Sequence, residues 1–466
     1  MPELKRDSIA QWAYDTRSIL GRFHLWLDDV EERYLEGDAN DALSFAGSGL
    51  ERAFIVSAGV TALGTRLFGR YGEGAGQDKE TTNRVKKDAD AVSAYALSEA
   101  LWYLTRHLPE NHAVLVSLGE GLMPKAGESP EMGSNPLLGF GRIYARPQVA
   151  RFLDERVHRL INEPGYEWDE FWHEIETAGI TVWGSAIDTL ENTSRFARGE
   201  EQGPMTVLHL FDQPLAVARP YEGYMGTLSL PRCVVDEAAL RSVLVDFRTP
   251  RKLVLDAILA SYPGVAPEHV QVWTLGGSSR NKRLGPLWDE WRELGVHLVE
   301  DGDPLPTGLP AFTDSGTYAP TFLVGPHRID GKTHVFIVDG YAASAEAMQA
   351  ASLDPILDMQ TSLCIFSSKF EVPSHREVDV MRLDPHGPEF KHQLQRTLGI
   401  DIDEDKRKLY RDVLVHAREA GMPLDKRTVT VDDFFPRKRW RLLSVAGFML
   451  TDPYTGAPGI EDLGDN

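Results

Sequence analysis

The chain has 466 residues, of which 42% are hydrophobic and 26% are charged, so it is long enough to bury two or three domain cores. Its 70 acidic and 49 basic residues give a formal net charge of −21, which repels nucleic acid and anionic membrane surfaces. The two cysteines, Cys233 and Cys364, lie far apart in the sequence and neither belongs to a CxxC pair. This excludes a disulfide framework and a cysteine-based zinc site, and it favours a reducing compartment.

The amino terminus, MPELKRDSIAQWAYD, lacks the basic-then-apolar pattern of a signal peptide. No run approaches the roughly 18 consecutive apolar residues that predict a membrane span. The basic stretch PRKRWR at 436–441 is short and embedded in an acidic chain, so we expect it to pair with an acidic surface rather than with RNA. We therefore expect a cytoplasmic protein that binds neither nucleic acid nor a membrane.

Residues 1–110 are expected to form a helical region that serves as core or as an oligomer interface. Between Ile9 and Leu35, large apolar residues recur at spacings of three and four, which makes one continuous apolar stripe. Two further helical runs are expected at about 41–71 and 80–107, separated by the glycine-rich segment GEGAGQDKE. The stripe consists of Trp12, Ile19, Leu20, Phe23, Trp26, Leu27, Val30 and Tyr34.

Residues 111–390 alternate between short apolar runs and helical patterns, which predicts an α/β core. Several of the apolar runs are nearly continuous, as in strands that are covered on both faces. Strands that alternate with helices favour a largely parallel, helix-covered sheet in a three-layer arrangement. The expected strands are AVLVSL (113–118), ITVWGS (180–185), TVLHLF (206–211), VQVWTL (270–275), VHLV (296–299), HVFIV (334–338) and SLCIF (362–366).

This α/β core divides into two candidate halves, 111–235 and 236–390. The segments LVSLGEG (115–121) and VWTLGGSS (272–279) both place a strand, a leucine and a glycine pair in that order. The echo is compatible with duplication or with chance, because a strand followed by glycine is how most α/β turns are made. Residues 391–466 are expected to be a helical extension that ends in the acidic tail GIEDLGDN.

The segment GGSSRNKR (276–283) has the residue types that bind an anion. Its glycines permit close approach of backbone N–H groups, its serines add hydroxyl donors, and its cations gather positive charge. Ligands of open parallel sheets bind at loops that follow the carboxyl ends of strands, as this segment does. The expected anion-binding residues here are Gly276, Gly277, Ser278, Ser279, Arg280 and Lys282.

The helix after this segment is expected to begin near Pro286, because the apolar pattern runs from Leu284 to Leu294. The glycines then lie about nine residues before the helix, too far for a nucleotide P-loop, in which the helix dipole faces the phosphate. An anion would therefore be held by the loop alone. The alternative is a solvated basic loop, or one that faces an acidic partner subunit.

Carboxylates follow the next two expected strands. Asp301 and Asp303 come just past the strand at 296–299, and Asp339 is expected at the junction of a strand and a helix. Clustered carboxylates beside a phosphate are typical of a magnesium site, so Mg²⁺ is the candidate cofactor and these three aspartates are its candidate ligands. The alternative is structural, because Asp339 is suited to cap its own helix and EDGD is favourable turn chemistry.

A second cluster of small hydroxyl and cationic residues, Ser367, Ser368 and Lys369, follows the expected strand at 362–366 and is a further candidate anion site. Phosphosugar-binding α/β domains hold phosphate with paired serine-rich turns, although this likeness is one of loop chemistry alone. His327, in an expected turn, is the candidate catalytic histidine, together with Asp339 and Asp303.

Two histidines, His297 and His334, fall inside strand patterns and are expected to be hydrogen-bonded core residues. The single ExxH, Glu170 and His173, is expected to be a solvated helix face, because a di-iron bundle needs that motif twice. No P-loop, GxGxxG, GxSxG, HExxH or EF-hand motif occurs, so no mechanism follows from motif spacing alone.

The leading hypothesis is an enzyme that acts on a small phosphorylated or carboxylated metabolite, such as a sugar phosphate, in a crevice at the carboxyl ends of parallel strands. The expected activity is of the isomerase, lyase or phosphatase type. The alternative is a non-catalytic assembly or scaffold protein, and a homo-oligomer is expected in either case.

Overall fold

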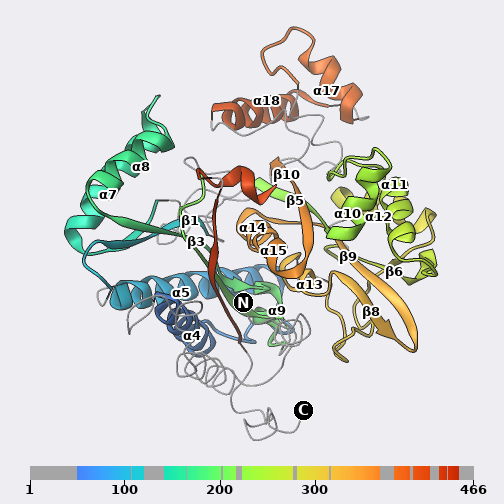
Figure 1. The fold of residues 1–466 in the computed structure, drawn as a ribbon, viewed down its shortest axis with the longest axis horizontal. Helices are drawn as coiled ribbons and strands as arrows, with labels where there is room; N and C mark the ends of the chain where they lie inside the picture. The colour runs from blue at the N-terminus through green and yellow to red at the C-terminus, as the bar shows by residue number, and fades with distance from the viewer. Residues whose placement is uncertain are drawn as a thin grey trace, which may run out of the picture. The chain divides into compact units, whose positions relative to one another are not determined.

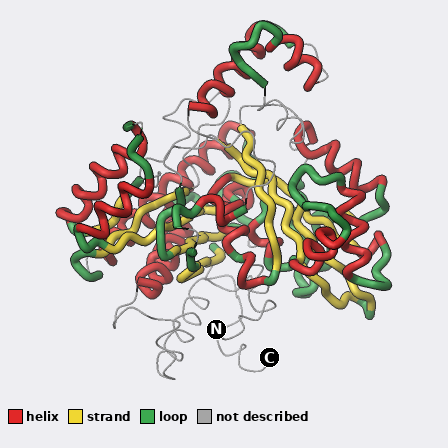
Figure 2. The backbone as a smooth tube through the Cα atoms, turned by 45° about the horizontal axis from the view of Figure 1, so that its top comes forward, coloured by secondary structure: helices red, strands yellow, loops and turns green. Residues whose placement is uncertain are grey.

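The computed structural model divides into two compact units, each with its own mixed β-sheet and its own helices, so the fold is mixed α/β (Figures 1 and 2). Unit 1 comprises Met1–Leu122, Ser134–Ala218 and Phe434–Asn466, and unit 2 comprises Met123–Gly133 and Arg219–Asp433. The residues that the structure describes are 50–105, 108–119, 141–163, 165–200, 203–216, 223–276, 281–313, 316–367, 383–398, 402–419, 430–437 and 439–450.

The sheet of unit 1 has five strands in the order β11-β4-β3-β1-β2. Strands β1 and β3 run parallel, and every other neighbouring pair in this order is antiparallel. The strands are β1 (His112–Gly119), β2 (Ile143–Ala145), β3 (Thr181–Glu191), β4 (Met205–Phe211) and β11 (Leu442–Met449).

Helices cover both faces of this sheet. Val114 and Val116 of β1 join a core cluster with Phe54 of α4, whereas the alternate residues Ala113 and Leu115 belong to the cluster of α7 and α8. This alternation follows from the period of two in a strand, and it explains why β1 is apolar at successive positions. The helices of unit 1 are α4 (Leu50–Phe68), α5 (Lys79–Thr105), α7 (Pro147–Asn162), α8 (Trp168–Thr177) and α9 (Thr193–Arg198).

The sheet of unit 2 has the strand order β10-β5-β9-β6-β7, and β8 pairs with the first half of β9. Strands β9, β6 and β7 run parallel to one another, whereas β5 is antiparallel to both β9 and β10. The strands are β5 (Gly223–Pro231), β6 (Val270–Trp273), β7 (His297–Leu298), β8 (Gly325–Ile329), β9 (Lys332–Ala343) and β10 (Met359–Ser367).

Helices also lie on either side of the strands of unit 2 (Figure 1). Val272 of β6 and Ile337 of β9 share a core cluster with α10, α11 and α12, whereas α14 packs against β5, β9 and β10. The helices of unit 2 are α10 (Arg232–Leu240), α11 (Arg251–Ser261), α12 (Asn281–Glu293), α13 (Tyr318–Thr321), α14 (Ser344–Ser352), α15 (Asp354–Leu357), α17 (Phe390–Leu398) and α18 (Glu404–Glu419), with 3₁₀ turns η1 (Pro267–His269) and η3 (Val431–Phe434).

Four neighbouring strands have the same order and the same relative directions in the two sheets. The series β1-β3-β4-β11 corresponds to β6-β9-β5-β10, with one parallel pair followed by two antiparallel pairs. Helix α4 packs on β4 and β11, as α10 packs on the corresponding β5 and β10. The sequence echo LVSLGEG and VWTLGGSS begins on the corresponding strands β1 and β6, although the order of the strands along the chain differs.

The structure does not confirm the largely parallel, three-layer sheet that the sequence predicted, because both sheets contain antiparallel strands. A continuous apolar run indicates that helices cover both faces of a strand. Strands of a mixed sheet are covered in the same way, so such runs do not tell whether neighbouring strands are parallel or antiparallel. The two compact units divide near residues 218 and 433. Helices α17 and α18 of the expected carboxyl-terminal extension belong to unit 2, and β11 belongs to unit 1.

Within the described part of the chain, no helix has both the length and the apolarity needed to cross a bilayer.

Candidate functional site

Helix α12 begins at Asn281 and not near Pro286, which lies inside the helix. The start of α12 was predicted too late along the chain, because the polar first turn, Asn281, Lys282 and Arg283, precedes the apolar pattern on which the prediction depended. Residues 274–280, which include the glycine-containing segment 276–280, therefore connect β6 to the amino terminus of α12. The observed spacing permits a helix-assisted anion site, because the N–H groups of the first helical turn, which have no partner within a helix, follow this segment at once.

Gly276 is held against the segment that follows β7. Its N–H donates to the carbonyl oxygen of Thr313 at 2.7 Å, and a Cβ at Gly276 would lie 2.2 Å from Thr313 Oγ1, so the approach requires glycine. Asp301 Oδ1 in turn accepts hydrogen bonds from Thr313 N at 2.6 Å and from Thr313 Oγ1 at 3.0 Å. Gly276 and Asp301, both expected at the site, thus meet through Thr313 at the carboxyl ends of β6 and β7.

The end of β9 reaches the same edge. Gly340 lies beside Leu275, and a Cβ at Gly340 would be 3.0 Å from Thr317 Cγ2. Thr317 is 1% exposed, and its Oγ1 has no hydrogen-bond partner among the described residues. The N–H groups of Thr317 and Tyr318 donate to Glu346 Oε1 at the start of α14, which fixes this turn. A buried hydroxyl without a partner is costly and is therefore a candidate ligand contact.

Asp303 faces a different partner from Asp301. Its Oδ2 accepts a hydrogen bond from Glu300 N at 2.8 Å and lies 2.7 Å from Nε2 of His297 on β7. The His297 side chain is 43% exposed, so the sequence was wrong to place it in the core. Among the described residues, no group of three or more His, Cys, Asp or Glu side chains is arranged to hold a metal ion.

Asp339 lies within β9, which continues to Ala343, so it does not cap a helix. It is fully buried on the sheet face that packs against α11 and α12. Its two carboxylate oxygens accept hydrogen bonds from Arg251 at 2.7 and 2.8 Å, and Oδ2 also accepts from Trp291 Nε1 at 2.7 Å. We therefore do not include Asp339 in the site, because a carboxylate engaged in this way is a structural counterion.

His327 lies at the other end of β9. It lies on β8 opposite His334, and its Nε2 donates a hydrogen bond to the carbonyl oxygen of Leu323 at 2.7 Å. His334 is half-buried beside His269, with the ring centroids 4.8 Å apart. Desolvation, with a smaller effect from His269, lowers the pKa of His334. The structure thus separates His327 from the edge that holds Gly276 and Asp301.

Most of the expected anion-binding side chains lie outside the described residues. Strands β6 and β10 run in the same direction, so both candidate clusters follow strands that end at one edge of the sheet. Three strand spacings separate β10 from β6, which corresponds to roughly 14 Å. The residues outside the description are Gly277, Ser278, Ser279, Arg280, Ser368 and Lys369, together with the side chains of Lys282 and Ser367.

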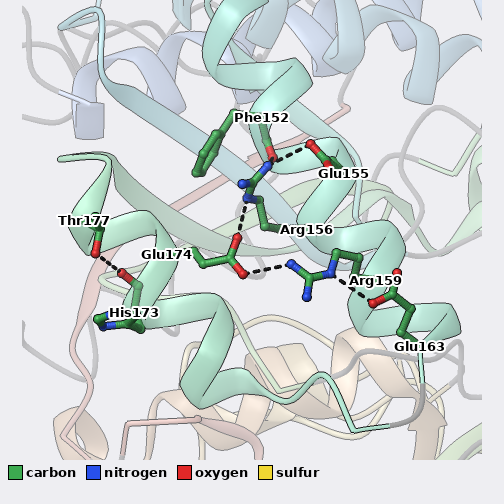
Figure 3. A network of polar contacts seen from close by, with 8 residues as sticks. All are labelled: Phe152, Glu155, Arg156, Arg159, Glu163, His173, Glu174 and Thr177. Carbon is green, nitrogen blue, oxygen red and sulfur yellow. Dashed lines mark hydrogen bonds and ion pairs between the residues drawn. The ribbon is translucent and has the colours of Figure 1, made fainter.

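The polar network on α7 and α8 of unit 1 is structural. Glu174 of α8 accepts hydrogen bonds from Arg156 Nε at 2.9 Å and from Arg159 Nη1 at 2.8 Å, which ties the two helices together (Figure 3). Glu170 completes the capping box of α8, and His173 contributes its carbonyl oxygen to Thr177. The ExxH pair therefore stabilises a helix and lies on its exposed side.

No protein-family model matches this sequence, and no curated protein is significantly similar to it. Function must therefore be inferred from the chemistry of the site itself.

Proposed function

We propose that this chain is an enzyme that binds a small phosphorylated or carboxylated metabolite, of the sugar-phosphate kind, at the carboxyl ends of β6 and β7. The observation that carries the proposal is that the segment 276–280 lies between the carboxyl end of β6, at Trp273, and the amino terminus of α12, at Asn281. A helix amino terminus offers unpaired N–H donors and the positive end of the dipole to an anion. Ser278, Ser279 and Arg280 add the hydroxyl and guanidinium donors that a phosphate accepts.

The close fit of Gly276 against Thr313 supports this assignment. Asp301 fixes Thr313, and Thr313 fixes the backbone where the anion segment begins, so this end of the segment is held before a ligand arrives. Binding a ligand costs less free energy when its hydrogen-bond donors are already in place than when they must first be ordered. The Thr317 hydroxyl, buried beside Leu275 and Gly340, is the group that we assign to a hydroxyl of the ligand.

We assign proton transfer to His297, with Asp303 as the carboxylate that orients its ring. The 2.7 Å contact between Nε2 and Oδ2 fixes the tautomer, and partial exposure leaves the ring accessible to a ligand. Asp303 thus keeps a role in the proposed chemistry. His297 takes the catalytic role that the sequence analysis gave to Asp339 and His327. Asp301 and Asp303 face different partners, so any Mg²⁺ would be carried mainly by the ligand phosphate.

The decisive experiment is a thermal-shift titration of the full chain with inorganic phosphate and with sugar phosphates, each with and without Mg²⁺. A ligand at 100 times its Kd stabilises the folded chain by about 2.7 kcal/mol, which is a measurable rise in Tm. We expect Arg280→Ala to reduce that rise. Arg328→Ala is the matched control, because Arg328 is an exposed arginine on β8 at the opposite end of β9, and it should leave the rise unchanged.

A separate variant tests catalysis. His297→Gln should abolish turnover of any sugar phosphate that binds and should retain the ligand-induced rise in Tm. The proposal is overturned if neither phosphate nor any sugar phosphate raises the Tm of the wild-type chain.

The alternative, a non-catalytic oligomeric scaffold, is supported by exposed apolar side chains. Leu240 is 83% exposed and Leu244 is 81% exposed, near the end of α10. Isolated exposed leucines are common, but grouped ones mark contact surfaces. Light scattering that shows a defined oligomer, combined with no response to any phosphate, would favour this second function.

A further inference from the structure

The face of the unit 2 sheet that α14 covers carries buried hydroxyl groups. Residues of β5 alternate between the two faces, and Leu228 and Leu230 belong to the core cluster of α10, α11 and α12. Thr227 and Ser229 therefore lie on the opposite face, where α14 packs against β5, β9 and β10, and both are fully buried. A buried hydroxyl costs free energy unless it makes a hydrogen bond, so each of these groups needs a partner.

Several buried hydroxyls of unit 2 have such a partner within the chain. Ser229 Oγ lies 2.8 Å from Thr361 Oγ1 on the neighbouring β10, and Thr361 Oγ1 donates to Asp354 Oδ1 at 2.8 Å. In α13, Thr321 Oγ1 donates to the carbonyl oxygen of Thr317 at 2.6 Å. Hydroxyls that serve the fold are thus closely paired here.

The two hydroxyls that flank Gly340 differ from these. Thr227 is the partner of Gly340 on the adjacent antiparallel strand, so the two Cα atoms are about 5 Å apart. Thr317 Cγ2 would be 3.0 Å from a Cβ at Gly340. In the part of the chain that the structure describes, no hydrogen-bond partner is found for Oγ1 of either threonine, and the exposed fractions of Thr227 and Thr317 are 0% and 1%.

Both hydroxyls are close to the ligand site. A Cβ at Gly340 would lie 3.6 Å from Leu275 N, so Gly340 is level with the point at which the segment 276–280 begins. Thr227 is one strand further along the sheet, and because neighbouring strands lie about 4.8 Å apart, about 10 Å separates β6 from β5. A pentose or hexose phosphate is long enough to place its phosphate at the segment and its hydroxyls beside Gly340.

We propose that Thr227 and Thr317 bind hydroxyl groups of the ligand, which is therefore a phosphorylated sugar or polyol rather than a simple phosphate ester or a carboxylate. This inference rests on the proposed function, which places the phosphate at 276–280. A threonine hydroxyl both donates and accepts, so it suits an alcohol better than a carboxylate, which only accepts. A ligand without the matching hydroxyl is rejected, because the buried groups of the site then stay without a partner.

Isothermal titration calorimetry of the full chain with ribose 5-phosphate, butyl phosphate and inorganic phosphate tests the inference. Butyl phosphate has the same charged end and no hydroxyl on its carbon chain. We expect the wild-type chain to bind ribose 5-phosphate about tenfold more tightly than butyl phosphate, because only the sugar makes the two hydroxyl contacts. Thr227→Val combined with Thr317→Val should abolish this preference and leave the affinity for butyl phosphate unchanged.

The Tm of the unliganded chain gives a second measurement. Valine has nearly the shape of threonine without the hydroxyl, so Thr227→Val removes a buried polar atom and should raise the Tm by about 2–4 °C. Thr206→Val in unit 1 is the matched control, because the buried Thr206 Oγ1 donates to the carbonyl oxygen of Thr189 at 2.9 Å. This control should lower the Tm and leave the binding of ribose 5-phosphate unchanged.

The possible failures are distinguishable. Equal affinity of the wild-type chain for ribose 5-phosphate and butyl phosphate would overturn this inference alone, because the site would then recognise only the phosphate. A lower Tm of Thr227→Val with unchanged affinity for ribose 5-phosphate would also overturn it, and would assign the hydroxyl to a buried water. Absence of binding by all three ligands would remove the proposed function and this inference together.

Discussion

Arg251 and Asp339 form a buried, bidentate ion pair that joins α11 to the centre of β9. Nε and Nη2 of Arg251 donate to the two carboxylate oxygens at 2.7 and 2.8 Å, and the exposed fractions of the two side chains are 5% and 0%. Nη1 of Arg251 donates to the carbonyl oxygens of Phe247 and Thr249. Trp291 adds a donor from α12, so one carboxylate anchors two helices to the sheet.

We expect Asp339→Asn to lower the free energy of unfolding of unit 2 by about 3–5 kcal/mol, because it leaves the guanidinium buried without a counterion. Urea denaturation measures this loss. The double variant Arg251→Met with Asp339→Leu should recover most of it, since neither charge then remains. The exposed pair Lys252 and Asp256 provides the control, and Lys252→Met should change stability by less than about 1 kcal/mol. An equal cost for Asp339→Asn and Lys252→Met would contradict the structural role of the pair.

We expect the stability of unit 2 to depend on pH because of the buried carboxyl group of Asp354. Burial raises its pKa to about 7, and the hydrogen bonds from Thr361 N and Oγ1 only partly oppose this effect. The folded chain therefore holds this proton more tightly than the unfolded chain, in which the carboxyl group has its ordinary pKa of 3.8. The protonated carboxyl group therefore stabilises folded unit 2 fully when the pH is below the ordinary pKa of 3.8, and this contribution is lost as the pH rises to about 7.

Asp354→Asn mimics the protonated side chain and is able to keep both contacts with Thr361. We expect it to raise the free energy of unfolding at pH 8 by a few kcal/mol, because each tenfold difference in proton affinity corresponds to about 1.4 kcal/mol. At pH 4 the substitution should change stability little. Denaturant titrations at the two pH values measure the difference. The same effect at both values would mean that Asp354 does not titrate in this range.

We expect the stability of unit 1 to change with pH in the opposite direction, because of His209 on β4. It is fully buried, and burial lowers its pKa from 6.5 to about 3. The unfolded chain therefore takes up a proton that the folded chain refuses, so stability is complete above about pH 6.5 and is lost as the pH falls toward 3. Between pH 7 and 5, acid should thus weaken unit 1 and strengthen unit 2. Limited proteolysis at the two pH values should show which unit opens, and His209→Leu should make unit 1 insensitive to the change.

Gly276→Ala tests the contact on which the anion site is built. Its Cβ would lie 2.2 Å from Oγ1 and 2.8 Å from Cβ of Thr313, so the two loops must separate. We expect a loss of about 1–3 kcal/mol in stability and a weaker response to phosphate. Adding Thr313→Gly removes the clash and should restore stability in part. A single alanine variant with unchanged stability would show that the contact is not tight.

The sequence located strands better than it located their directions. All seven expected strands overlap observed ones, because apolar runs of this length bounded by glycine and proline are specific enough. It missed β5, in which Gly223 and Gly226 interrupt the apolar pattern and Pro231 closes it. It also missed β2, β8 and β11, and β8 lies where a turn around His327 was expected. Direction was beyond reach, since helices cover both faces of parallel and antiparallel strands alike in this chain.

The site was predictable where it depends on local order along the chain. Gly276 and Asp301 follow the neighbouring parallel strands β6 and β7, so local order along the chain is enough to place them at one edge of the sheet. The partner of Asp339 was not predictable, because Arg251 lies 88 residues away and no local pattern joins them. Thr313 and Thr317 were also missed, although the small and hydroxyl-bearing run TDSGT between β7 and β8 is a signal for such a turn.

Unit 2 interrupts unit 1 along the chain, because Arg219–Asp433 lies between β4 and β11. Gln213, just past β4, donates to the carbonyl oxygen of Arg439, just before β11, across 226 residues of sequence. During synthesis the ribosome releases β11 only after residues 219–433 of unit 2, so the edge of β4 in the unit 1 sheet stays unpaired while that part of unit 2 emerges. Unit 2 is thus able to fold first, and the sheet of unit 1 is completed only after β11 has been released.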